Sequence, residues 1–190
     1  MPKKAKYVIL RAVRPVGTRD PFRGGFRSAG APRASEPEEV NVDTDELSSS
    51  NVRDLARDAS VAAIARVMPT KLFRPFEIGE AAATPAWGVA AIGADGTSFT
   101  GQGVPVAVLD TGIDANHPAF QGVQVIQQDF SGDGNGDVDG HGTHCAGTIF
   151  GRDVDGTRIG IARGVGQAFI GKVLSNDGSG SSDALFQGMQ

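Results

Sequence analysis

The sequence has few of the features that define disulfide-rich or membrane-spanning proteins. One of its 190 residues is a cysteine, Cys145, so no intrachain disulfide can form. No window approaches the roughly 18 consecutive apolar residues of a membrane span. The basic N-terminus is followed by only four apolar residues, 7–10, too few for a signal peptide. We therefore expect no membrane partner, recognise no signal peptide, and leave the localisation open.

Phosphate-binding motifs are also lacking. Neither G-x-x-x-x-G-K-[ST] nor G-x-G-x-x-G occurs, so the 27 glycines do not indicate a nucleotide site. Residues 1–33 carry nine basic residues and one acid (+8), and residues 34–190 carry nine basic and 21 acidic residues (−12). A basic arm can bind nucleic acid, but no recognition motif accompanies it. We expect no nucleic-acid partner and interpret residues 17–35 as a disordered leader.

Glycine divides the chain into two regions. Only five of the 27 glycines precede Trp87. The length fits one domain or two small ones, since domains commonly have about 150 residues. We predict a small domain over residues 1–78, a linker or processing segment over 79–86, and a second domain over 87–190.

The first region has the patterns of a small α+β domain. Residues 6–13, 39–47, 61–68 and 71–76 are rich enough in apolar or β-branched side chains for strands. A helix follows the second of these and could be capped by Ser50 or Asn51. Its expected inner stripe, at i, i+3, i+4 and i+7, consists of Val52, Leu55, Ala56 and Ala59.

The second region indicates an α/β fold with a parallel sheet. Residues 104–109 form a nearly continuous apolar run, as expected of a strand buried on both faces, and Asp110 follows directly. In open α/β sheets, ligands and catalytic groups collect at the carboxyl ends of the strands. The alternative is that Asp110 only caps the next turn.

A histidine-containing cluster lies at residues 139–149. Gly140 and Gly142 flank His141 and would let the backbone approach closely, while Ala146, Ile149 and Phe150 predict a largely buried helix that His141 begins. An imidazole can accept a proton from a hydroxyl if an acceptor orients its other nitrogen. We expect Asp110 to be that acceptor.

The stretch V-A-V-L-D-T-G-I-D-x-x-H-P at 106–118, followed by H-G-T-H-C-A-G-T at 141–148, resembles the subtilisin-like serine peptidases (subtilases, peptidase family S8). The resemblance covers residues 87–190. It implies a serine endopeptidase with a polypeptide substrate, in which Asp110 is the triad acid and His141 the general base. Four further motif residues are expected to be structural: Asp114, His117, Thr143 and His144.

The resemblance extends to the substrate groove and, more weakly, to the N-terminal region. It places Leu174, Gly178, Ser179 and Gly180 at the edge that binds the peptide. Residues 1–78 resemble a subtilase propeptide, which would lay its C-terminal tail in the groove as an added strand. An unrelated α+β domain is the alternative. Processing would fall near residues 77–86.

Two subtilase features do not occur in these 190 residues: the G-T-S-M-A motif of the nucleophilic serine and the asparagine that binds the oxyanion. Ser98 follows Gly-Thr but precedes the aspartate strand, and Ser179 and Ser181 have no base arranged beside them. We therefore interpret the chain as the front part of a longer peptidase that is inactive by itself. The alternative is a noncatalytic inhibitor of the propeptide type. A sheet interrupted midway should expose an edge and apolar surface, so we expect poor solubility.

We expect no cofactor and no strong metal site. His141, His144 and Cys145 lack the spacings of zinc sites. Ala119 replaces the acid that in subtilases often helps to bind calcium. The acidic loop 129–139 starts like an EF-hand, but Gly140 stands where the bidentate glutamate is needed. Weak calcium binding by this loop or by Asp153 and Asp155 is the alternative to a solvated glycine turn.

Overall fold

The computed structural model describes residues 3–12, 40–74 and 87–190 and divides the chain into two compact units, residues 1–67 and 68–190. The predicted disordered leader (17–35) and processing segment (77–86) lie outside the described residues. The first unit contains the strands β1 (Ala5–Ala12), β2 (Val40–Leu47) and β3 (Val61–Arg66) and the helix α1 (Ser49–Leu55). The second contains α2 (Trp87–Ala91), η1 (Ala94–Gly96), η2 (Pro118–Phe120), α3 (His141–Phe150), α4 (Ser182–Gly188), β4 (Pro69–Lys71), β5 (Val106–Asp110), β6 (Gln124–Asp129), β7 (Gln167–Lys172) and β8 (Ser179–Ser181). No described helix has the length and apolar composition needed to cross a membrane.

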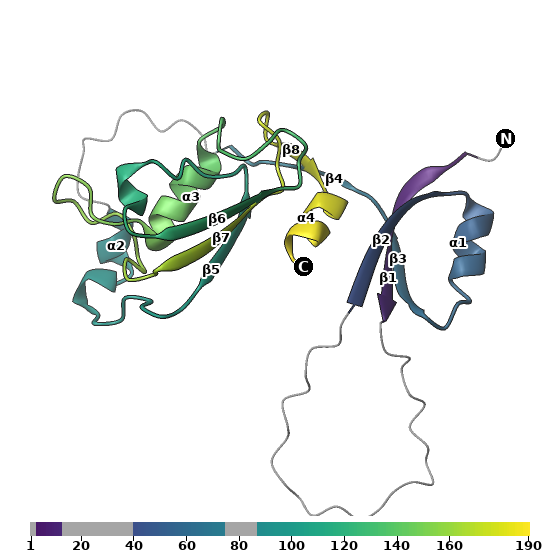
Figure 1. Ribbon diagram of the computed structural model, residues 1–190, viewed down its shortest axis with the longest axis horizontal. Coiled ribbons are helices and arrows are strands. Elements are labelled where there is room, and N and C mark those ends of the chain that lie inside the picture. Colours follow the sequence, from purple (N-terminus) through teal and green to yellow (C-terminus); the bar gives the residue numbers. More distant parts are fainter. Residues whose placement is uncertain (1–2, 13–39, 75–86) are drawn as a thin grey trace, which may run out of the picture. The chain divides into compact units, whose positions relative to one another are not determined.

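The first unit is an antiparallel sheet in the order β2-β1-β3, with α1 beside it (Figure 1). Neighbouring residues Val8 and Ile9 of the central strand are both buried. Since successive side chains point to opposite faces, both faces of β1 are covered. Arg11 adds ion pairs to Asp43 (3.1 Å) and Asp58 (3.3 Å) and so connects β1 to β2 and to the turn before β3.

The helix of this unit differs from its prediction at both ends. Ser48 is the N-cap, and its hydroxyl accepts from the Asn51 N–H (3.3 Å), so neither predicted cap residue serves. The helix ends at Leu55, and Ala56 and Ala59 are exposed. The expected stripe was therefore too long, because the helix begins two or three residues earlier than predicted and ends before a third turn.

The second unit confirms the predicted α/β class with a parallel sheet. The strands of the parallel sheet follow the order β5-β7-β6, and both neighbouring pairs are parallel. Figure 1 shows α3 lying across this sheet. The core consists of Val108, Ile113, Ala119, Phe120, Ala146, Phe150, Val165, Ala168 and Ile170.

Some apolar side chains of the second unit are not buried. Ile149, predicted to be buried with Ala146 and Phe150, is 37% exposed, because α3 turns only one stripe toward the core. Phe169 and Ile126 on the parallel sheet are 43% and 40% exposed and line a hollow with Leu109 and Phe130. Apolar surface therefore lies open on one face of this sheet.

The strand β4 belongs to the second unit although its residues precede Trp87. Pro69–Lys71 pairs antiparallel with Ser179–Ser181, and the Leu72 N–H donates to the Gly178 carbonyl (2.8 Å). The predicted strand over 71–76 was misplaced, since pairing begins at Pro69 and residues 72–74 are not in a strand.

Candidate active site

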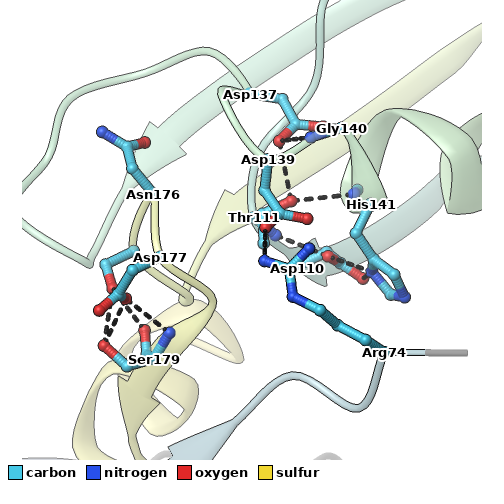
Figure 2. Close-up of polar contacts among 12 residues, drawn as sticks. Arg74, Asp110, Thr111, Asp137, Asp139, Gly140, His141, Asn176, Asp177 and Ser179 are labelled. Atoms are coloured by element: carbon cyan, nitrogen blue, oxygen red, sulfur yellow. Dashed lines mark hydrogen bonds and ion pairs between the residues drawn. The ribbon is translucent and has the colours of Figure 1, made fainter.

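The structure brings Asp110 and His141 into direct contact. Asp110 is the last residue of β5 and His141 is the first of α3, and the His141 Nδ1 lies 2.8 and 3.0 Å from the two carboxylate oxygens (Figure 2). The side chain of Asp110 is 12% exposed and that of His141 is 30% exposed. The carboxylate is thus shielded, while the imidazole retains access to solvent.

Backbone and hydroxyl hydrogen bonds fix the position of the carboxylate. The Thr111 N–H donates to Asp110 Oδ1 (2.7 Å), and the Thr111 hydroxyl accepts from the Gly142 N–H (2.9 Å). Thr111 is fully buried. It therefore connects the end of β5 to the first turn of α3 and sets the distance between the acid and the histidine.

The two glycines around His141 serve different purposes. Gly140 has φ = 91°, a conformation that L side chains rarely adopt, and has open space around its Cα. A Cβ at Gly142 would lie 2.2 Å from the Gly112 carbonyl oxygen. We expected close approach of backbone segments at both glycines. It occurs at Gly142, whereas at position 140 glycine is needed because the turn has a positive φ.

Asp137 is a site residue that the sequence analysis did not single out. Its carboxylate accepts from the Thr143 N–H (2.8 Å) and hydroxyl (2.6 Å), from the Gly140 N–H (2.9 Å) and from the Thr111 hydroxyl (2.9 Å). Because Gly140 has no side chain to cap α3, Asp137 takes that role. Burial raises the pKa of Asp137, but these hydrogen bonds outweigh it, so the pKa lies below 3.8.

Lys172 is a second residue that was missed. It ends β7, is 2% exposed, and donates to the Thr111 carbonyl (2.5 Å), the Asn176 side-chain oxygen (2.9 Å) and the Gly136 carbonyl (3.2 Å). A buried ammonium requires such acceptors. Lys172 thereby holds together three segments around the Asp110–His141 pair. The available signal was a lysine that follows the apolar run A-F-I-G at 168–171 and precedes Val173.

Cys145 lies one helical turn beyond His141, with its Sγ 3.7 and 3.8 Å from the two ring nitrogens. Burial is the main cause of a raised Cys145 pKa, and the nearby Asp110 adds to it. Asp110, His141 and Cys145 offer ligand atoms within 4.8 Å of one another, the one such group in the described residues. A metal there would have to displace the Asp110–His141 hydrogen bond and deprotonate a thiol whose pKa is raised. The absence of a metal stays a prediction.

The four remaining motif residues make local contacts. The Thr143 hydroxyl accepts from the Asp114 N–H (3.0 Å), and the Asp114 carboxylate accepts from the Asn116 N–H (3.0 Å). The His117 ring accepts from the Ala119 N–H (3.2 Å) at the start of η2, and the His144 N–H continues α3. These contacts fit structural roles.

The acidic loop folds around one of its own carboxylates. Asp129 accepts from the N–H groups of Ser131, Gly132 and Gly134 and from the Ser131 hydroxyl. Burial raises the pKa of Asp129, but these hydrogen bonds have the larger combined effect, so the pKa is lowered. Backbone donors thus occupy this carboxylate in the turn, and weak calcium binding stays an untested alternative.

The predicted peptide-binding residues lie together at one edge. Leu174 forms a β-bridge with Gly180, and the Ser175 N–H donates to the Ser179 carbonyl (2.7 Å). Gly178, with φ = 78°, makes the turn between them. The strand β4 pairs with this edge, and Figure 2 shows the Asp177–Ser179 turn in the same view as Asp110 and His141. Ser179 donates to Asp177 (2.6 Å) rather than to an imidazole.

Comparisons with known proteins show what this chain is similar to, and the match to a family model lies within the second unit. Residues 101–190 match the family model described as the Subtilase family (Peptidase_S8). Subtilisin-like protease 6 of Trichophyton rubrum is 41% identical over 114 residues, and that of Arthroderma gypseum is 37% identical over 114 residues. Each alignment covers 56% of this chain and 26% of the relative, so the chain spans about a quarter of these relatives.

A solved structure described as a cold adapted subtilisin-like serine proteinase is 37% identical in sequence to this chain, with a TM-score of 0.41. The match covers 48% of this chain and 32% of the chain in that structure. The motifs around Asp110 and His141 lie within the segment that the family model matches. Residues 101–190 are therefore similar to part of the proteins of the subtilase family.

Proposed function

We propose that this chain is part of a serine endopeptidase in which Asp110 and His141 are two members of a catalytic triad. The observation that carries the proposal is the contact of His141 Nδ1 with both oxygens of Asp110, at 2.8 and 3.0 Å. In the proposed arrangement Nδ1 donates its proton to Asp110, and Nε2 is the nitrogen that accepts a proton during the reaction.

The proposed reaction is acyl transfer to a serine that lies outside residues 1–190. The serine oxygen adds to the scissile carbonyl carbon while its proton moves to His141 Nε2. Asp110 stabilises the resulting imidazolium. The intermediate then expels the amine, which takes the proton from His141, and water releases the acyl group by the same steps.

The substrate is proposed to be a polypeptide bound as an added strand along Leu174 and Gly178–Gly180. The pairing of β4 with β8 supports this proposal, since an extended segment of the chain itself already occupies the edge. Residues 1 to about 78 would then act as a propeptide-type inhibitor of the same site. Neither a nucleic-acid partner nor a cofactor is needed for this reaction.

The test is His141→Ala in the full-length protein. We expect the variant to lower kcat by several orders of magnitude, because the serine loses its general base. His144→Ala, three residues along the same helix, is the matched control and should reduce activity far less. A His141→Ala enzyme that cleaves peptides at a near-normal rate would exclude the assignment.

A noncatalytic inhibitor is the second candidate, favoured by the same β4–β8 pairing. Purified residues 1–190 can be assayed for peptide cleavage and for inhibition of a subtilase added in trans. Inhibition without cleavage would support this second candidate, whereas cleavage by residues 1–190 alone would contradict the proposed external serine.

A further inference from the structure

The segment that pairs with β8 continues toward the Asp110–His141 pair. After β4 and the Leu72–Gly178 hydrogen bond, the chain reaches Arg74, whose guanidinium forms an ion pair with Asp139 at 2.5 Å. Figure 2 shows the Arg74 side chain pointing to Asp139 in the region of Asp110 and His141. A basic side chain of a bound strand thus contacts the loop that leads into the proposed general base.

Asp139 differs from the other acids that form ion pairs with an arginine in the described residues. Its side chain is 5% exposed, whereas Asp153, paired with Arg163, is 41% exposed and Asp54, paired with Arg57, is 75% exposed. Ion pairs between exposed groups contribute little, but an enclosed carboxylate that loses its partner is costly. In the described parts of the chain, Arg74 supplies the cation for Asp139.

The partner itself is less enclosed. The Arg74 side chain remains 65% exposed, and Phe73 beside it is 93% exposed. With Arg74 in contact, the carboxylate is thus the shielded half of the pair and the arginine is the exposed half.

We propose that Asp139 is a specificity-determining residue that selects an arginine or lysine in the polypeptide substrate. The selected substrate residue would take the position of Arg74, which is three residues after Lys71, the residue that pairs with Ser179. This inference rests on the proposed function and goes beyond it by naming a substrate class. Arg74 occupies the site while the segment lies on β8, and a substrate side chain takes its place when the segment leaves.

The test uses the full-length protein and two peptides that differ in one residue. One peptide carries arginine at the position equivalent to Arg74 and the other carries citrulline, which has nearly the same shape but no charge. We expect kcat/KM to favour the arginine peptide by about tenfold or more, since hydrogen bonds to charged groups are among the stronger ones. Added salt should reduce the ratio.

Variants then assign the preference to Asp139. Asp139→Asn should reduce the arginine-to-citrulline ratio to near one, and Asp139→Glu should retain part of it. Asp153→Asn, which removes an exposed carboxylate from a different ion pair, is the matched control and should keep the full ratio.

The outcomes separate the two proposals. Cleavage that depends on His141 but shows no arginine preference in the wild-type protein overturns this inference and leaves the proposed function standing. A preference that Asp139→Asn does not change also overturns it. Failure of the wild-type protein to cleave either peptide removes both proposals.

Discussion

The two units hold their strands together by different means. In residues 1–67, the central strand β1 is hydrogen-bonded on both sides, and the described buried hydrophobic side chains are few: Val8, Ile9 and Leu47. In residues 68–190, a short parallel sheet depends on a larger core and on backbone segments that touch through glycines. The second unit should therefore tolerate added atoms near its site poorly, whereas the first depends more on backbone pairing and capping.

The largest expected effect is that of Gly142→Ala. The new Cβ would lie 2.2 Å from the Gly112 carbonyl, so the start of α3 must move away from the end of β5. We expect a loss of at least about 2 kcal/mol in the free energy of unfolding, measured by thermal denaturation. Hydrogen exchange should rise in α3 and not in β1–β3.

Gly88→Ala is the matched control for that change. Gly88 lies within α2, and a Cβ added there would have no atom within 4 Å, so alanine should be neutral or slightly stabilising at this position. Equal destabilisation by both substitutions would contradict the claim that close backbone packing distinguishes the second unit around its site.

A smaller effect is expected for Asp137→Ala, which removes the cap of α3. Capping residues contribute about 1–2 kcal/mol. The pKa of Asp137 is lowered in the folded protein, so its stabilisation is fully present above the unfolded value of 3.8 and is lost as the pH falls below that value toward the folded pKa. The stability difference between wild type and variant should therefore shrink in acid, as measured by denaturant titration from pH 7 downward. A difference that is constant over this range would show that the ionised carboxylate is not the capping group.

The smallest effect is expected in the first unit, for Ser48→Ala. Loss of the hydroxyl that accepts from the Asn51 N–H should cost about 1 kcal/mol and increase hydrogen exchange within α1. Ser49→Ala is the control, because Ser49 is exposed and its carbonyl, not its hydroxyl, makes the described contact with Arg53. Similar effects of the two variants would argue against Ser48 as the cap.

Sequence reasoning succeeded where one local pattern dominated. The apolar run before Asp110 predicted a buried strand with an acid at its end, and the glycine-flanked His141 predicted the start of a helix. It failed where several residues offered the same chemistry. Three consecutive serines can cap α1, and only the burial of Ser48, which is 3% exposed, selects one of them.

The order of the chemical groups along the chain was readable because an apolar strand, a glycine turn and a helix start are local preferences of the backbone. The contacts of Asp137, Lys172 and Asp139 could not be read from the sequence. Each of these residues contacts at least one group that is distant from it in sequence. Only folding brings those segments together, and the environment of a buried charge is set by whatever the fold places around it. The sequence alone thus indicated that Asp110 and His141 meet, whereas the tertiary structure decided which residues hold the two side chains in place and which charged groups lie beside them.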